Sequence, residues 1–410
     1  MKTRNITKTA ALFAAMMAST GFAVSNDALL DLLVQKGVIS QDEASQVAKE
    51  LEAERPVMVT AKSKAVKDLK LTGRLHMQYD NISNDDNRDS QNGFYFRRIY
   101  LGAEAKFAND WYGSIVGNFG GKDDSINVDK AVVGWKYDPK AEFEVGYTKV
   151  PFGFYETTSS SKIKTVERSI ANRYFAEEDG LRFASRYTGV FVDGDLGAGF
   201  SYDAALVTAD ASNARDDDLV GYENGLGAFG RLEWKSEKTD MGQLLVGLDL
   251  GYKQDGSYFV DDSSNEGTGG VGMGDLFGYG LHANYSVGNF NLSGEFLGAT
   301  VEDVAGEDVD VFGVTVIPSY KITDKWELVA AFSTIDTDGA DLLDADDLVR
   351  RSNTGKGYDE GTSYYIGFNY YIIGNDLKLS GGYERASFES ANGSSEVEID
   401  AFRLRLQALF

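Results

Sequence analysis

The sequence predicts an all-β protein, a 16-stranded antiparallel transmembrane β-barrel with a short N-terminal helical segment. Glycine, tyrosine and phenylalanine are abundant and proline is scarce, with 46 Gly, 22 Tyr and 24 Phe against 4 Pro in 410 residues. Apolar and polar residues alternate along many short segments, which is the periodicity of β-strands. The connections between these segments are alternately short and long, as in barrels of the bacterial outer membrane.

Residues 1–23 have the layout of a secretory signal peptide. A basic stretch over residues 2–8 precedes an apolar stretch over 10–18, and the small residues Gly21 and Ala23 mark a cleavage point. The apolar stretch is too short to span a bilayer. We therefore expect an exported protein from which residues 1–23 are removed.

Residues 24–67 are predicted to form two short helices in the periplasm. Leucines and Val34 recur at helical spacing until Gly37, and Ser40 with Glu43 is typical of a capping box at the start of a second helix, which ends before Pro56. A helix pair this short buries little apolar surface by itself. The segment is either a coiled-coil-like region that self-associates or a solvated leader.

From Asp68 onward the period of the sequence changes to two. In "LKLTGRLHMQY" (69–79) and in "DAFRLRLQALF" (400–410), apolar residues alternate with polar or basic ones, and the second segment ends on Phe410. A terminal phenylalanine resembles the signal by which bacterial outer-membrane barrels are recognised for insertion. Sixteen such segments begin near residues 68, 92, 110, 126, 141, 181, 198, 220, 242, 274, 289, 309, 325, 361, 376 and 397.

The lengths of the connections predict the closed form of the sheet. Long connections follow the segments ending near residues 79, 119, 150, 208, 253, 300, 335 and 388, and the others are short turns. No stretch of eighteen apolar residues occurs after the signal peptide, so a transmembrane helix is not expected. A barrel satisfies the requirement that every backbone polar group be paired in lipid. Aromatic residues at strand ends are placed for interfacial girdles: Trp111, Tyr137, Tyr147, Trp234, Tyr252 and Trp326.

The formal net charge of −24 is concentrated in the long connections. None of these acidic stretches has the spacing of an EF-hand loop, so no metal site is expected. They are predicted to be solvated at the cell surface, next to membrane lipid and lipopolysaccharide. The inward face of the barrel is predicted to be mixed, with carboxylates beside these basic residues: Arg74, Arg98, Lys130, Arg182, Arg186, Arg231, Arg403 and Arg405.

The third long connection gathers positive charge in an otherwise acidic chain. Its sequence "ETTSSSKIKTVERSIANR" (156–173) carries Lys162, Lys164, Arg168 and Arg173. If this connection folds back into the lumen, its cations narrow the channel and favour anions, because rings of Arg and Lys select for them. The alternative is a surface loop whose basic residues pair with neighbouring acidic loops.

The sequence shows no pattern typical of an enzyme or a cofactor protein. It has no cysteine, no phosphate-binding loop that opens a helix, and only two histidines, His76 and His282, on different predicted strands. We expect no catalytic residues, no cofactor and no nucleic-acid partner. An outer-membrane enzyme or an adhesin remains as a distant alternative.

Two segments resemble the phosphate-selective porin O and P family: "FYFRRIYLGAEAKFANDWYGSIVGNFGG" (94–121) and "VGYTKVPFGFYETTSSSKIKTVERSIANRYF" (145–175). The resemblance implies a homotrimeric porin that passes phosphate and related anions through a channel lined by arginine and lysine. It assigns anion contact to Arg97, Arg98 and Tyr100 and to the basic residues of the third connection. Strand parity would direct Arg97 to the lipid, or to the headgroup boundary, if Arg98 faces the lumen.

The acidic composition and the inward carboxylates differ from a purely cationic channel. They leave a general-diffusion or weakly cation-tolerant porin of the same fold as the alternative function.

Overall fold

The structure is a computed structural model, and it describes residues 65–85, 91–120, 126–177, 180–209, 225–254, 275–302 and 308–410. The predicted signal peptide (1–23) and all but the last residues of the predicted helical segment (24–67) lie outside the described residues. None of the described helices is long and apolar enough to cross a membrane.

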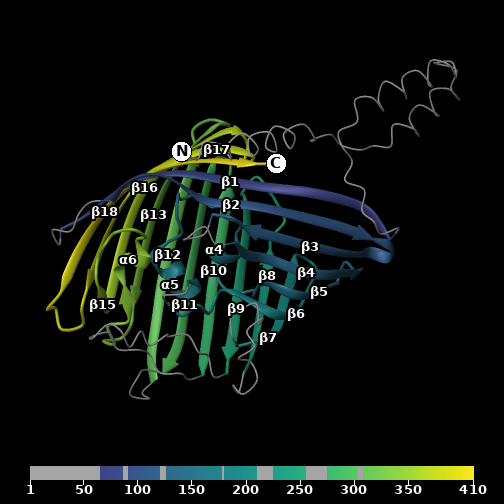
Figure 1. Cartoon of the computed structure of the whole chain (residues 1–410), viewed down its shortest axis with the longest axis horizontal. Helices are drawn as coiled ribbons and strands as arrows, with labels where there is room; N and C mark the ends of the chain where they lie inside the picture. Colours follow the sequence, from purple (N-terminus) through teal and green to yellow (C-terminus); the bar gives the residue numbers. More distant parts are fainter. Residues whose placement is uncertain are drawn as a thin grey trace, which may run out of the picture. The chain divides into compact units, whose positions relative to one another are not determined.

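Residues 70–409 form one compact unit, in which sixteen antiparallel strands close into a barrel (Figure 1). This confirms the predicted fold class. Closure is made by β1 and β18, which pair from Arg74 opposite Leu409 to Asn84 opposite Ile399. The barrel strands are β1 (Val66–Asn84), β2 (Gln91–Phe107), β3 (Trp111–Asn118), β4 (Asn127–Asp138), β5 (Ala141–Lys149), β6 (Arg186–Gly197), β7 (Phe200–Thr208), β8 (Leu226–Lys235), β9 (Gln243–Lys253), β10 (Leu276–Val287), β11 (Phe290–Glu302), β12 (Asp308–Lys321), β13 (Trp326–Asp336), β16 (Glu360–Ile373), β17 (Leu377–Glu389) and β18 (Glu396–Leu409).

The alternation of side chains determines which face of each strand meets lipid. On β9, Leu248, Leu250 and Tyr252 are exposed on the outside, whereas Asp249 and Lys253 are buried on the inside. Because side chains point to opposite faces in turn, this single pattern gives the barrel an apolar outer surface and a polar inner one.

Aromatic rings gather at the end of the barrel that carries the short turns. The rings of Trp111 and Trp135 are stacked 5.5 Å apart across β3 and β4. On the other side of the barrel, Trp326 of β13 packs against Tyr370 of β16 with 4.7 Å between ring centroids. Such rings suit the membrane interface, where one side is apolar and the other is wet.

The observed connections differ from the predicted ones at several places, among them the start of β8 at Leu226 rather than near residue 220. Strand β1 continues to Asn84 and β11 to Glu302, so the connections over 85–90 and 303–307 are shorter than predicted. Strand β6 begins at Arg186 rather than near residue 181. Arg182 has a left-handed φ of 47°, which a strand cannot include, and residues 181–185 belong to the preceding connection.

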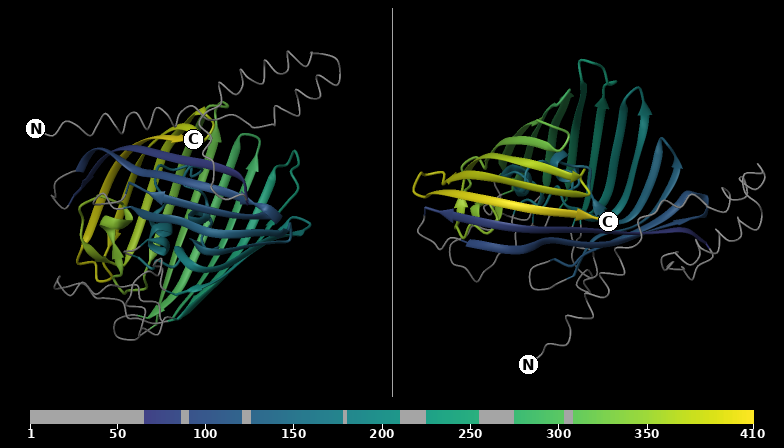
Figure 2. Two further views of the ribbon diagram at one scale, coloured as in Figure 1. Left: turned by 45° about the vertical axis from the view of Figure 1, so that its right-hand side comes forward. Right: turned by 90° about the horizontal axis from the view of Figure 1, so that it is seen from above.

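The described residues of the third long connection, loop 3 (residues 150–185), lie inside the barrel. Its base is closed by the hydrogen bond from the N–H of Val150 to the carbonyl of Ser185 (3.1 Å). It contains α4 (Phe154–Thr157) and α5 (Ile170–Ala176), which the ring of strands surrounds in Figure 2. Ser169 caps the start of helix α5, because its hydroxyl accepts a hydrogen bond from the N–H of Asn172.

A second connection, loop 7 (residues 337–359), also folds inward. It holds β14 (Leu343–Asp344), α6 (Ala345–Leu348) and β15 (Lys356–Tyr358), and β14 and β15 form a separate two-stranded sheet. A short 3-10 turn, η1 (Ala108–Asp110), joins β2 to β3. The inward fold of loop 7 was not predicted.

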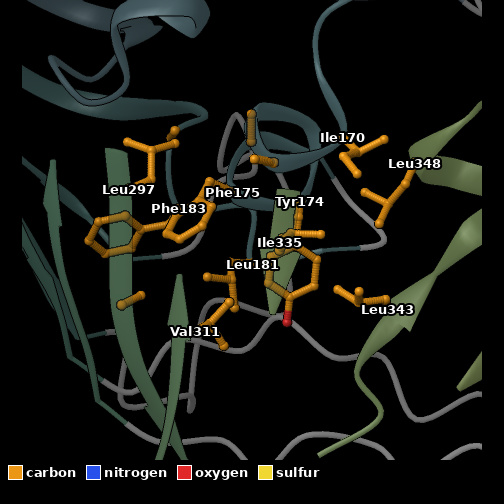
Figure 3. Close-up of a cluster of buried hydrophobic side chains, with 14 of the residues drawn as sticks. Ile170, Tyr174, Phe175, Leu181, Phe183, Leu297, Val311, Ile335, Leu343 and Leu348 are labelled. Atoms are coloured by element: carbon orange, nitrogen blue, oxygen red, sulfur yellow. The ribbon is translucent and has the colours of Figure 1, made fainter. Parts of the chain in front are cut away.

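The two loops and one wall of the barrel enclose an apolar core (Figure 3). Because apolar side chains are removed from water here, the hydrophobic effect fixes both loops to the wall. The core fills that side of the lumen with protein. Its labelled members are Ile170, Tyr174 and Phe175 from α5, Leu181 and Phe183 from loop 3, Leu297, Val311 and Ile335 from β11 to β13, and Leu343 and Leu348 from loop 7.

Two glycines on the wall make room for the ring of Phe183. Gly251 of β9 and Gly278 of β10 lie opposite each other in the sheet. A Cβ atom at these positions would lie 2.7 Å and 2.3 Å, respectively, from atoms of that ring. Because neither glycine has a side chain, the wall leaves space for the ring of Phe183. We call this space the seat of loop 3.

We expect Gly278→Ala to displace Phe183 and to loosen loop 3, because the added methyl overlaps a fully buried ring. Overpacking of this kind costs about 1–3 kcal/mol. Thermal unfolding in detergent should show the loss of stability, and single-channel recordings should show a noisier current. Gly294→Ala is the matched control, since its nearest neighbour lies 3.7 Å away. Equal stability of the two variants would contradict the role of the seat.

Candidate functional site

Loop 3 is held by polar contacts to the strands around it. Near its start, the N–H of Gly153 donates to Asp249 of β9 (2.9 Å), and the hydroxyl of Tyr155 donates to Ser293 of β11 (2.9 Å). Arg231 of β8 donates to the hydroxyl of Thr157 (2.7 Å). These inward polar positions of the strands thus act as anchors for the loop.

The middle of loop 3 runs past the short-turn ends of β16 to β18. Lys378 donates to the carbonyls of Ser161 (3.2 Å) and Ile163 (3.1 Å). Asn369 donates to the carbonyl of Lys164 (2.9 Å). The loop therefore extends through most of the depth of this wall.

The four predicted cations of loop 3 have different surroundings. Lys164 forms an ion pair with Glu327 of β13 (3.0 Å) and also contacts the hydroxyl of Ser319. Lys162 is exposed, and its ammonium has no ion pair or side-chain hydrogen bond within the described part of the chain. Lys162 is thus the loop lysine whose charge is free to act on a solute.

Arg168 and Lys149 share the carboxylate of Glu156. The Nε of Arg168 lies 3.0 Å from Oε2 of Glu156, and Lys149 of β5 contacts Oε1. Arg168 also donates to the carbonyls of Tyr155 (2.9 Å) and Thr158 (2.8 Å). Burial alone would raise the pKa of Glu156, but Arg168 and Lys149 outweigh burial and lower that pKa to about 2.

Further predicted residues lie on the wall that faces this group. Arg186 of β6 forms an ion pair with Asp129 of β4 (2.7 Å). Lys130 forms one with Glu144 of β5 (2.7 Å). Arg182 is half-buried, and its carbonyl accepts a hydrogen bond from the hydroxyl of Tyr187 (2.6 Å).

Arg74 of β1 joins the loop to this wall. Its Nη1 donates to the hydroxyl of Ser160 (2.6 Å), and its guanidinium lies 5.3 Å from the centre of the Tyr100 ring. Arg74 also interacts electrostatically with Arg168, Arg186 and Asp129. The structure thus brings the predicted residues Tyr100, Arg168 and Arg186 together around Arg74.

The expected outward position of Arg97 is wrong. Its side chain is 17% exposed and forms an ion pair with Glu167 of loop 3 (3.0 Å), so it points inward. Tyr95 also points inward, whereas Phe94 and Phe96 are exposed outside. Because Tyr100 faces the lumen as well, the inward positions of β2 change from odd to even numbers between residues 97 and 100, as a β-bulge would cause.

Arg98 is buried near this change of parity. Its exposed fraction is 7%, and among the described residues its Nη1 has no hydrogen-bond partner. Arg98 and Arg97 therefore both belong to the interior, which simple alternation did not allow.

The carboxylate of Glu167 is the centre of a second cationic group. Arg97 (3.0 Å) and Arg405 of β18 contact it directly, and Arg173 (3.8 Å) and Arg350 (3.9 Å) lie close. Burial would raise the pKa of Glu167, but Arg97, Arg405 and Arg173 hold it well below its usual range. The three guanidinium groups therefore favour the ionised form of this carboxylate.

Arg173 ties loop 3 to loop 7. It is 1% exposed, and it donates to the carbonyl of Leu348 in α6. Burial and the nearby Arg350 lower the pKa of Arg173 to about 10, against the raising effect of Glu167. The side chain is buried between the loops, so it supports them rather than lining open lumen.

Several cations near the site were not among the predicted contact residues. Lys149 and Lys378 belong to strands, and Arg350 and Arg351 to loop 7. Arg350 and Arg351 could have been found from the sequence, because "VRRSNTGKG" (349–357) is a basic stretch within an acidic connection. In the described ranges, no three His, Asp or Glu side chains are grouped so that they could hold a metal ion.

A comparison of sequences identifies the family to which this barrel belongs. The sequence profile of the phosphate-selective porin O and P family matches residues 69–222 and 255–410. The chain belongs to this family. It is therefore an outer-membrane porin, and its barrel is a channel. No curated protein is significantly similar to this porin in sequence.

Solved structures share the fold of this porin at low sequence identity. The anion-selective porin from Comamonas acidovorans is 12% identical and has a TM-score of 0.60, with 84% of this chain and 99% of that chain covered. OprB of Pseudomonas putida is 13% identical, with a TM-score of 0.59 and coverage of 84% and 94%. The channel DcaP of Acinetobacter baumannii is 14% identical, with a TM-score of 0.56 and coverage of 86% and 100%.

We expect Glu156→Gln to destabilise the porin by about 3–5 kcal/mol at pH 7, because it leaves Lys149 and Arg168 without their buried partner. In the wild type, the ionised carboxylate of Glu156 should stabilise the fold fully above its ordinary pKa of about 4.5. This stabilisation should be lost as the pH falls towards about 2. The measurement is thermal unfolding in detergent between pH 7 and pH 2. A stability difference between wild type and variant that vanishes already at pH 6 would contradict this assignment.

Proposed function

We propose that this porin is a passive, water-filled channel that prefers anions, phosphate among them. The preference arises where loop 3 faces the wall formed by β1 to β6. The observation that carries this proposal is the group of cations around Arg74 on that side of the lumen.

The exposure of inward side chains indicates where water and solutes pass. On the wall covered by loop 3, Ser333, Asn369 and Gln407 are at most 2% exposed. On the opposite wall, the side chains of Lys130 and Arg186 are 32% and 26% exposed. The passage therefore runs beside β2 to β6, eccentric to the barrel.

The charge on this passage favours anions. Four cations lie together there, Arg74, Lys149, Arg168 and Arg186, and the carboxylates that pair with them are Glu156 and Asp129. The partners of Arg74 are hydroxyl groups and an aromatic ring. Low-dielectric walls concentrate the field of such an excess and raise the local concentration of anions.

The planar guanidinium groups also support a preference for oxyanions. Their N–H groups can donate two parallel hydrogen bonds to one phosphate or sulfate. Further along the same wall, Tyr112 donates to Glu142 (2.6 Å) and Glu144 (2.7 Å). These carboxylates moderate the field, so we propose an anion preference rather than an exclusion of cations.

The proposal also covers how the porin is exported and assembled. Residues 1–23 would direct the chain across the inner membrane and be removed, and the apolar outer face would contact lipid and lipopolysaccharide. We propose a homotrimer, as the family resemblance implies; a trimer form is known for OmpT of Vibrio cholerae. Light scattering of the porin in detergent should give the mass of three chains, and a monomeric mass would exclude this assembly.

We expect Arg74→Gln combined with Lys162→Gln to lower the anion-to-cation permeability ratio by roughly tenfold. Neither cation forms an ion pair with a carboxylate among the described residues, and Asp129, which interacts with Arg74 at longer range, keeps Arg186 as its partner. The measurement is the reversal potential in planar bilayers under a KCl gradient.

The matched control is Arg385→Gln, because Arg385 lies on the outer face and pairs with Glu398. A wild-type channel without ion preference would indicate a general-diffusion porin. If the wild type prefers anions but the double variant has the same anion-to-cation permeability ratio, the residues responsible for the preference lie elsewhere.

A further inference from the structure

Carboxylates gather on the wall of the passage where β5, β6 and β7 reach their short turns. Glu142 is the second residue of β5, and Asp193 and Asp203 lie on either side of the turn that joins β6 to β7. The three side chains lie next to one another across the sheet, because Glu142 is paired with Asp193 and Asp193 with Asp203. We call these three residues the acidic row.

The acidic row faces the lumen. Residues directly opposite each other in a sheet point to the same face, and Asp203 is opposite Arg231, which donates to Thr157 of loop 3 (2.7 Å). On the outer face of the same two strands, Val190 and Leu206 are exposed. The carboxylates of the row therefore border the water of the passage.

The two aspartates of the row keep their charge. Asp193 and Asp203 form no ion pair among the described residues. Arg231, opposite Asp203, donates instead to both carboxylate oxygens of Asp249 (2.6 and 2.7 Å). Like charges directly opposite each other destabilise a sheet. The aspartate pair thus opposes folding, and its charge is left to act on ions in the passage.

The lysines on this wall do not offset the two aspartates. Lys136 forms an ion pair with Glu142 (2.7 Å), and Lys130 forms one with Glu144 (2.7 Å), so each lysine already has a carboxylate of its own. Glu104 of β2 also interacts electrostatically with Lys136 and adds a further negative charge. This end of the passage therefore carries a net negative charge.

The cationic group around Arg74 lies further from the short turns on the same strands. Lys149 is the last residue of β5, Arg186 is the first residue of β6, and the two are paired across the sheet. Asp193 follows Arg186 by seven residues, a distance of about 23 Å along an extended strand. Because the Debye length is about 10 Å at 0.1 M salt, the cationic group and the acidic row act as separate regions at that ionic strength.

We propose that Asp193 and Asp203 are specificity-determining residues of the passage, and that they make the porin rectify ionic current. A solute that crosses the passage meets positive charge on the long-loop side and negative charge on the short-turn side. The inference rests on the proposed anion-preferring channel, whose cationic group supplies the positive region, and adds to it a dependence on the direction of flow.

The order of the two regions determines the direction in which current flows more easily. When the short-turn side is positive, cations enter past the acidic row and anions enter past the cationic group. Each kind of ion is attracted by the region that it meets first, so both accumulate where the regions join. The opposite voltage draws both kinds of ion away from this junction, and the conductance falls.

The test is the current–voltage relation of the full-length porin in planar bilayers with about 0.1 M KCl on both sides. We expect a roughly twofold larger current when the short-turn side is positive than at the same voltage of opposite sign. At about 1 M KCl, where the Debye length is about 3 Å, the two currents should become equal. Met241→Cys reports the orientation through a membrane-impermeant thiol reagent, because Met241 is 81% exposed in the turn between β8 and β9 and the chain has no cysteine.

Asp193→Asn combined with Asp203→Asn removes the two uncompensated charges. We expect the ratio of the currents to fall to about one, and the reversal potential in a KCl gradient to shift towards stronger anion preference. The double variant should fold, because it relieves a repulsion between neighbouring strands.

The matched control is Asp308→Asn combined with Asp310→Asn, which removes two carboxylates of β12. These positions alternate with the buried Val309 and Val311 and therefore lie on the outer face. The ratio of the currents in this control should equal that of the wild type.

Rectification of the expected polarity that is lost in the Asp193 and Asp203 variant and kept in the control supports the inference. Equal currents in the wild type, the opposite polarity, an unchanged ratio in the variant or an equal loss in the control would overturn it. The reversal potential of the wild type tests the proposed function separately. Anion preference without rectification keeps the proposed function and rejects the role of the aspartates. Rectification that depends on the aspartates in a channel without anion preference supports their role and contradicts the proposed function.

Discussion

The interior of this porin depends on the carboxylate of Glu167. Without that negative charge, Arg97 of β2, Arg405 of β18 and Arg173 of α5 would repel one another in a region that excludes water. With it, the loop and the closing strands of the barrel attract one another. Buried ion pairs of this kind add little net stability compared with apolar packing, but they strongly oppose any other arrangement of the same groups. The charge cluster therefore specifies where loop 3 lies, and the apolar core around Phe175 and Leu297 supplies much of the energy that keeps it there.

The pairing of buried charges also explains how an acidic protein can attract anions. Its carboxylates within the lumen are mostly used internally, in pairs such as Glu156 with Arg168 and Glu327 with Lys164. A solute responds to charges that no carboxylate compensates, and among the described residues such cations are the half-buried Arg74 and the exposed Lys162. Net charge summed over the whole chain thus has little bearing on the field inside the passage.

The sequence predicted the fold well because its decisive signals are local. Alternation and turn length placed most strand starts within a few residues, since the two faces of each strand meet lipid and lumen. Arg97 was misplaced because a change of parity within β2 depends on pairing with neighbouring strands. The pairing of Lys164 with Glu327 could not be predicted, because it joins a loop residue to a strand residue far away in the sequence. The inward fold of loop 7 depends on apolar residues such as Leu343 and Leu348. These few apolar residues stand among many acidic ones, so the sequence of the connection did not indicate that it would be buried.

The apolar filling between the loops and β11 to β13 separates the size limit of the channel from the number of its strands. A sixteen-stranded ring fixes only the outer circumference; how much of the cross-section stays wet depends on how bulky the enclosed side chains are. Relatives with identical strand counts can therefore sieve molecules of different dimensions by exchanging residues such as Phe183 or Leu297, which no permeating solute ever touches. Substitutions at these apolar interior positions can therefore change the permeability of the channel without altering the lipid-facing surface.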